Sequence, residues 1–262
     1  MQEIKKKIFY LFLFLFFIIG SITSLDVGIS HDEWHEQQNW EYNRDLSLNL
    51  KNNFFSDEVN NFDSSDYKDK YYGIGFQIIS QPIQFLIKDL IFKYQNINEF
   101  GSKLIAKHFV VFIFFFISGI TFYLISKKII NNKDFCYFSL GIYLLYPYLF
   151  GNSLFSPKDI PFMSTWIICT FISFNIFEKL IKKKVLTYSK VIVFGIATAF
   201  LLSIRVTGIL IFLQYFVTFF LFLNIERISI LSFFKNYYLK LITFTSFLIL
   251  FLYSFYPLYW NN

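Results

Sequence analysis

The chain has 262 residues, of which 55% are hydrophobic and 23% aromatic, a share too large for the core of an ordinary soluble domain of this length. The net charge of +6 does not indicate nucleic-acid binding, because residues 26–70 hold 11 acidic and 4 basic residues while the rest holds 7 and 20. Cys136 and Cys169 lie in apolar stretches, which argues against a disulfide framework. The composition predicts an all-α integral membrane protein, with residues 1–262 forming a single membrane domain.

The first apolar run, residues 8–25, follows three lysines and is long enough to cross most of a bilayer core of about 30 Å. A cleaved signal peptide is the competing interpretation. No clear small-x-small cleavage site follows the run, so we expect an uncleaved signal anchor.

Six further spans are expected between residues 104 and 262, which gives about seven transmembrane helices. Twenty basic residues belong to the parts of the sequence other than residues 26–70. If the lysines before the first span are cytoplasmic, the alternating direction of successive spans places 14 of these 20 on the cytoplasmic side. Residues 26–103 then form an outer-face acidic loop. The six spans are residues 104–126, 135–155, 160–177, 191–204, 208–223 and 241–259.

Two further apolar stretches each allow two interpretations. Residues 73–92 contain several glutamines, a proline and Lys88, so an interfacial helix in the outer leaflet suits them better than a crossing. A crossing there would also invert the orientation of all later spans. Residues 191–223 are too long for one simple span, and we expect them to divide near Arg205, where Gly208 permits a tight turn or close packing.

Asp32 and Glu33 follow the first span closely and are the catalytic candidates. A carboxylate that is partly desolvated beside a membrane can act as a general base, and a neighbouring one can contact a metal or a donor. A solvated acidic loop is an equally open alternative. His31 and His35 lack the His-Glu-x-x-His order of zinc proteases, so a divalent cation such as Mg²⁺ or Mn²⁺, held by Asp32 and Asp159, fits better than zinc.

A second polar segment, residues 152–162, is expected on the same side. Lys158 could neutralise a phosphate and Asp159 could lie near Asp32, although Asp159 could equally cap the next helix while Lys158 extends to the interface. The remaining candidates for phosphate binding on this face are Arg205, Lys107 and His108.

The order of these elements resembles the polytopic GT-C glycosyltransferases, which include protein O-mannosyltransferase-like and lipid A sugar-transferase-like enzymes. The resemblance covers nearly the whole chain and is carried by an Asp-Glu pair beyond the first span and by later polar elements. The matching segments are residues 31–35, 71–73, 107–108, 152–162 and 204–208.

The resemblance implies that a hexose or pentose passes from a polyprenyl-phosphate donor to an acceptor hydroxyl on the outer side, generally with inversion. Asp32 matches the first-loop carboxylate and would be the base, with Glu33 as alternate base or orienting group. Lys158 and Arg205 would stabilise the leaving phosphate. Asp159 matches the second acidic position and could bind acceptor, sugar or cation.

The implied partners are the polyprenyl-phosphate sugar, a lipid, glycan or protein acceptor, and membrane lipids. The expected location is a bacterial inner membrane, with the acidic loop facing the periplasm or the exterior. The chain is shorter than such enzymes usually are, so a truncated or non-catalytic membrane subunit is an alternative. A transporter or flippase for a lipid-linked sugar is another, although the predicted spans hold few ionisable groups.

Overall fold

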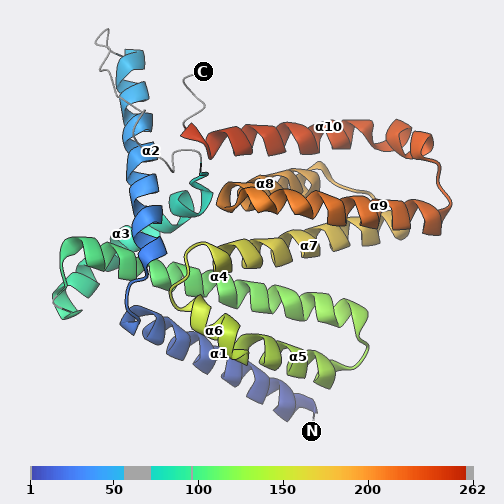
Figure 1. Ribbon diagram of the computed structural model, residues 1–262. Coiled ribbons are helices and arrows are strands. Elements are labelled where there is room, and N and C mark those ends of the chain that lie inside the picture. The colour runs from blue at the N-terminus through green and yellow to red at the C-terminus, as the bar shows by residue number, and fades with distance from the viewer. Residues whose placement is uncertain (1, 56–71, 96, 258–262) are drawn as a thin grey trace. The chain divides into compact units, whose positions relative to one another are not determined.

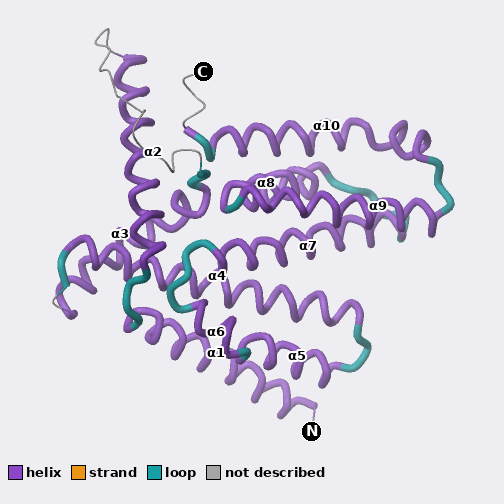
Figure 2. Tube along the Cα trace, in the orientation of Figure 1, coloured by secondary structure: helices purple, strands orange, loops and turns teal. Residues whose placement is uncertain are grey.

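The computed structural model describes residues 2–55, 72–95 and 97–257, and within these residues all regular structure is helical (Figures 1 and 2). Short loops join most successive helices. In chain order the elements are α1 (Gln2–Asp26), α2 (His31–Phe55), α3 (Gly75–Gln95), α4 (Glu99–Ile129), α5 (Lys133–Leu145), α6 (Pro147–Ser153), α7 (Asp159–Ile181), α8 (Tyr188–Ile204), the 3₁₀ helix η1 (Val206–Leu210), α9 (Ile211–Glu226) and α10 (Ile230–Ser254).

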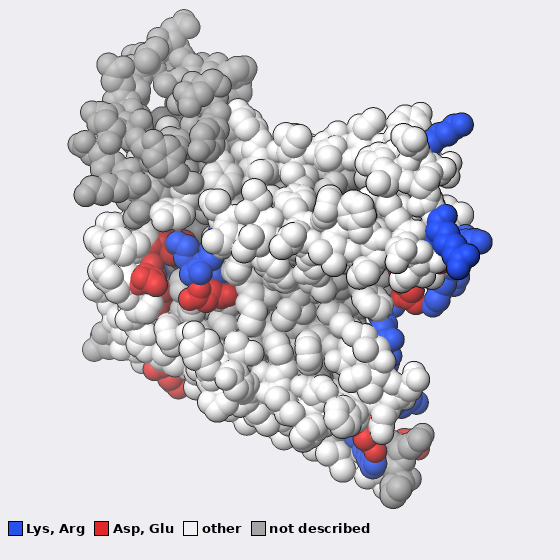
Figure 3. Space-filling view, turned by 45° about the vertical axis from the view of Figure 1, so that its right-hand side comes forward, with Lys and Arg blue, Asp and Glu red and all other residues white. Residues whose placement is uncertain are grey.

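Five helical stretches in the described part of the chain are long and apolar enough to cross a bilayer. At about 1.5 Å per residue, each is long enough for a hydrocarbon core of about 30 Å. Broad parts of the molecular face in Figure 3 carry no charged side chain. These are the features of an all-α, multi-pass membrane protein. The five stretches are Glu3–Asp26, Glu99–Ile129, Asp159–Ile181, Val206–Glu226 and Ile230–Ser254.

The other two expected crossings, residues 135–155 and 191–204, do not form helices of that length. The first is divided at Pro147 into α5, with 13 residues, and α6, with 7. Proline has no backbone N–H and disfavours helical dihedral angles in the residue before it, and Tyr146 is extended, with φ −61° and ψ 117°. The second is α8, an apolar helix of 17 residues. Seven crossings are therefore not confirmed.

The acidic segment after the first span contains a helix where we expected a loop. Ser30 and Glu33 have the spacing of a capping box, and the Ser30 amide donates to Oε1 of Glu33 at 2.7 Å. This bond satisfies a backbone donor at the beginning of α2, which runs from His31 to Phe55. Residues 56–71 of the expected loop lie outside the described residues, as does Tyr71 of the GT-C-like segments.

Helix α3 occupies the place of the expected interfacial helix and turns its polar side chains inward. Gln77 and Gln84 are almost fully buried, whereas Phe85 and Leu86 are 65% and 74% exposed. This pattern is the reverse of that of a helix on the surface of a soluble protein, whose apolar stripe faces the core.

The described chain divides into two compact units. The first comprises residues 1–37 and 77–167, and in it α4 packs against α1, α5 and α6, with Phe112 and Phe115 fully buried. The second comprises residues 38–76 and 168–262, and in it α8 packs along α10. The helices α2, α3 and α7 each contribute residues to both units.

Contact between α1 and α4 depends on Gly20. A Cβ atom added there would overlap the tip of the buried Phe112 ring, whereas one added at Gly141 on α5 would meet nothing within 4 Å. We expect Gly20→Ala to be less stable than Gly141→Ala by about 1–3 kcal/mol, the usual cost of overpacking. Thermal unfolding in detergent checks this, and equal midpoints for the two variants would show that the ring moves aside without cost.

Candidate functional site

Glu33 is held inside the first unit, where it joins the start of α2 to α4. Its side chain and that of His108 are fully buried, with Oε2 of Glu33 2.7 Å from Nε2 of His108. Nδ1 of His108 lies 3.0 Å from the carbonyl oxygen of Ser24, so this nitrogen carries a proton and donates it to that carbonyl. A second proton lies between Glu33 and His108, so the two side chains form either an imidazolium–carboxylate pair or a neutral acid–imidazole pair. Because the Ser30 amide donates to the other oxygen, both oxygens of Glu33 have partners.

A second group of buried hydrogen bonds involves Gln37 on α2. Its Oε1 accepts from Nζ of the fully buried Lys107 at 3.1 Å and from Nε2 of Gln84 at 3.4 Å. Nε2 of Gln84 also donates to the carbonyl oxygen of Lys103 at 2.5 Å. The three helices α2, α3 and α4 are thus connected through side chains that would be costly to bury without partners.

Glu36 connects the two polar segments that the sequence singled out. Its Oε1 lies 2.9 Å from Nζ of Lys158, 122 residues later, and its Oε2 accepts from Nε2 of Gln77 at 3.2 Å. The Lys158 and Glu36 side chains are 23% and 14% exposed, so this ion pair is partly shielded from water. The pair brings the segment before α7 to the beginning of α2.

The remaining acidic candidates are exposed. Asp32 lies in the first turn of α2 and makes no hydrogen bond or ion pair with the described residues. Asp159 is the first residue of α7, and one of its oxygens accepts from the Ser156 hydroxyl at 3.4 Å. Both lie near the helix N-termini, where a negative charge is stabilised by the backbone amides. They belong to the same two segments as Glu36 and Lys158.

Among the described residues, no three or more His, Cys, Asp or Glu side chains are grouped so that they could hold a metal ion. His31 and His35 approach each other, with 3.1 Å between their Nε2 atoms. No third ligand of these types joins the two histidines in the described part of the chain.

Arg205 belongs to the second unit, in the break between α8 and η1. Its backbone is extended, with φ −147°, and its carbonyl oxygen accepts from the Gly208 amide at 2.9 Å. A Cβ atom at Gly208 would lie 3.1 Å from the Leu201 carbonyl oxygen, so glycine permits the close packing expected there.

Sequence reasoning did not place Glu36, Gln37 or the glutamines of α3 in the site. Gln77, Gln81 and Gln84 recur at helical spacing and so mark one face of α3. That face could be identified from the sequence. Its direction could not, because in a bilayer a polar face can point either to water or to buried polar partners. No family model, curated protein or solved structure matches this chain.

Proposed function

We propose that the chain is a GT-C-type glycosyltransferase that passes a sugar from a polyprenyl-phosphate donor to an acceptor hydroxyl on the non-cytoplasmic side of the membrane. The observation that supports this proposal best is the Glu36–Lys158 ion pair. It joins the carboxylate-rich segment that directly follows the first apolar helix to the segment before α7, which offers a cation. A transferase of this type needs both, a base for the acceptor and a positive charge for the leaving phosphate.

In this proposal Asp32 is the base that removes the proton from the acceptor hydroxyl. It is exposed at the first turn of α2, so an acceptor can approach it. Lys158, oriented by Glu36, stabilises the charge that develops on the leaving polyprenyl phosphate. Asp159 binds the acceptor, the sugar or a divalent cation such as Mg²⁺ or Mn²⁺.

Glu33, Lys107 and His108 have supporting roles in this proposal. All three are fully buried, and Glu33 and His108 contact each other instead of facing an open surface. We infer that they are positioning residues, because they fix the first turns of α2, and with them Asp32 and Glu36, against α4. This modifies the expectation that Lys107 and His108 contact phosphate directly.

The proposed topology places the beginning of α2 and of α7 outside and the lysine-rich ends of the spans in the cytoplasm, in a bacterial inner membrane. The reversed polarity of α3 supports an interfacial position, because Phe85 and Leu86 would meet lipid while Gln77 and Gln84 face protein. The positive-inside rule supports the orientation.

The direct test is transfer by the purified full chain in proteoliposomes, supplied with labelled polyprenyl-phosphate sugars and envelope lipid extract as the acceptor source. Release of polyprenyl phosphate together with labelled product supports the proposal. Movement of the donor between leaflets without transfer would instead indicate the flippase, and neither activity would indicate a non-catalytic subunit.

Lys158→Gln is expected to reduce kcat for transfer by about 10²–10³-fold, the typical cost of removing one electrostatic donor from a developing oxyanion. Lys158→Arg should retain part of the activity, since it keeps the charge. The matched control is Lys103→Gln, which removes a lysine that pairs with the exposed Glu99. An equal loss in the Lys103 and Lys158 variants would remove Lys158 from its role.

A further inference from the structure

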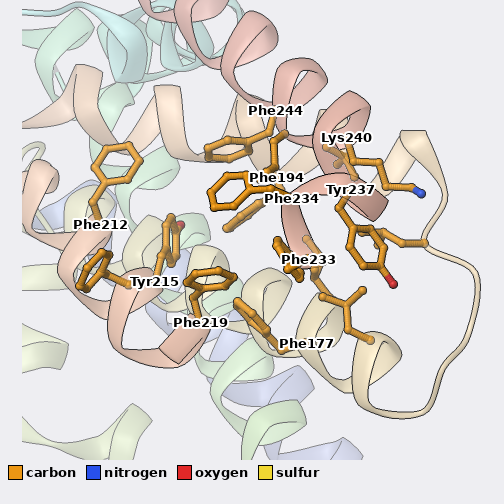
Figure 4. Close-up of a pocket in the computed structure, with 16 residues that line it drawn as sticks. Phe177, Phe194, Phe212, Tyr215, Phe219, Phe233, Phe234, Tyr237, Lys240 and Phe244 are labelled. Carbon is orange, nitrogen blue, oxygen red and sulfur yellow. The ribbon is translucent and has the colours of Figure 1, made fainter. Parts of the chain in front are cut away.

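The second unit contains an apolar cavity of about 410 Å³ that is lined by α7, α8, α9 and α10 (Figure 4). Aromatic rings from all four helices form much of its wall, among them Phe177, Phe194, Phe219, Phe233 and Phe244. The volume falls within the range of about 300–1,000 Å³ that is usual for small-molecule sites. Walls of this kind offer too few polar partners to hold ordered water, so the suitable occupant is a hydrocarbon chain.

The close approach of two helices fixes one side of the cavity. A Cβ atom at Gly195 on α8 would lie 2.8 Å from the carbonyl oxygen of Phe244 on α10, so only glycine permits this spacing. Phe194 and Phe244 both line the cavity, and their ring centroids are 4.9 Å apart. The backbone contact therefore positions part of the aromatic wall.

One cation lies in the wall itself. Nζ of Lys240 is 5.2 Å from the ring centroid of Tyr237 and 5.6 Å from that of Tyr188, so two aromatic faces hold the ammonium group at the cavity. In Figure 4 the Lys240 side chain extends toward the same end of the cavity as the Tyr237 hydroxyl. Tyr188 begins α8, which places this group at the lysine-rich end of the helix bundle.

Further lysines surround that end. The Lys179 side chain lies within hydrogen-bond reach of Lys190 and within electrostatic range of Lys184, and the residues that follow Lys179 and Lys190, Leu180 and Val191, line the cavity. The nearby carboxylate of Glu178 is paired with Lys182. Like charges that lie close together repel each other. A phosphate group beside the three lysines would offset this repulsion and would itself be stabilised by their positive charge.

We propose that this cavity binds one acyl chain of an anionic phospholipid whose phosphate lies beside Lys240, Lys190 and Lys179. The apolar walls select the acyl chain of the lipid, and the lysines select its negative head group. The site is separate from the proposed glycosyl transfer, since it contains none of the residues assigned to that reaction, and it would bind lipid whether or not the chain is an enzyme.

The test uses the full chain in nanodiscs that contain phosphatidylglycerol or phosphatidylcholine with a photoreactive diazirine in the middle of one acyl chain. We expect phosphatidylglycerol to label cavity-lining peptides of α7–α10 about fivefold more than phosphatidylcholine. Both lipids carry a phosphate, but the choline cation cancels its charge, and the difference is what one favourable interaction of a lysine with a net negative head group would give. Equal labelling by the two lipids would overturn the proposal. Excess polyprenyl phosphate should not compete better than unlabelled phosphatidylglycerol, and if it does, the occupant is a polyprenyl lipid instead.

Matched variants distinguish the contribution of the lipid head group from that of the acyl chain. The double variant Lys190→Gln/Lys240→Gln should lose the preference for phosphatidylglycerol, whereas Lys235→Gln, exposed on the same helix α10, should keep it. Val191→Phe and Leu241→Phe each fill the cavity from a different helix and should reduce labelling by both lipids. Full labelling in a filling variant that unfolds at the wild-type temperature would contradict binding in the cavity.

Discussion

Replacing Asp32 by asparagine is expected to lower kcat for sugar transfer by about 10²–10⁴-fold, the contribution of a general base. The substitution keeps the size of the side chain and removes only the ability to accept a proton. Because Asp32 is exposed and makes no hydrogen bond or ion pair with the described residues, little change in stability should accompany the loss. Single-turnover transfer from a polyprenyl-phosphate sugar measures the effect.

The control is Asp26→Asn, which changes another exposed carboxylate six residues earlier, at the end of α1. It should leave transfer unchanged. If the Asp32 variant transfers sugar as fast as the wild type, Asp32 is not the base, and Asp159→Asn becomes the informative substitution. A glutamate at position 32 should recover part of the rate only if a carboxylate is needed there.

The second large effect is expected on stability, from the buried pair of Glu33 and His108. Glu33→Ala leaves the His108 ring without its partner and removes the acceptor for the Ser30 amide. Breaking a buried pair from one side typically costs about 3–5 kcal/mol. We therefore expect a markedly lower midpoint of thermal unfolding in detergent, and a similar loss for His108→Ala.

The double variant Glu33→Ala/His108→Ala should cost less than the sum of the two single variants, because neither partner is then left buried alone. Glu99→Ala serves as control, since its carboxylate is exposed and its ion pairs with Lys88 and Lys103 are worth about 0–1 kcal/mol. Strict additivity, or a Glu33 variant as stable as the Glu99 variant, would show that the pair does not hold α2 in place.

The long apolar helices were predictable because hydrophobicity is a local property of the sequence. The runs at residues 8–25, 104–126 and 160–177 lie within α1, α4 and α7, and the run at residues 241–259 lies on α10 as far as Ser254, where that helix ends. The single crossing expected at residues 135–155 is not formed. We predicted it from the many apolar residues of this segment, which do not reveal that Pro147 interrupts the helix. The Ser30–Glu33 spacing could also have indicated the start of α2, but the high charge of the segment favoured a loop.

The sequence by itself determined that the chain is helical, apolar and charged unevenly along its length, since each of these follows from residues close together in the chain. Only the tertiary structure decided which of two adjacent carboxylates is buried: Glu33 meets His108, 75 residues away, while Asp32 faces outward. It likewise decided that Glu36 pairs with Lys158. These contacts depend on how α2, α4 and the start of α7 pack, and no local pattern encodes the distance between residues so far apart.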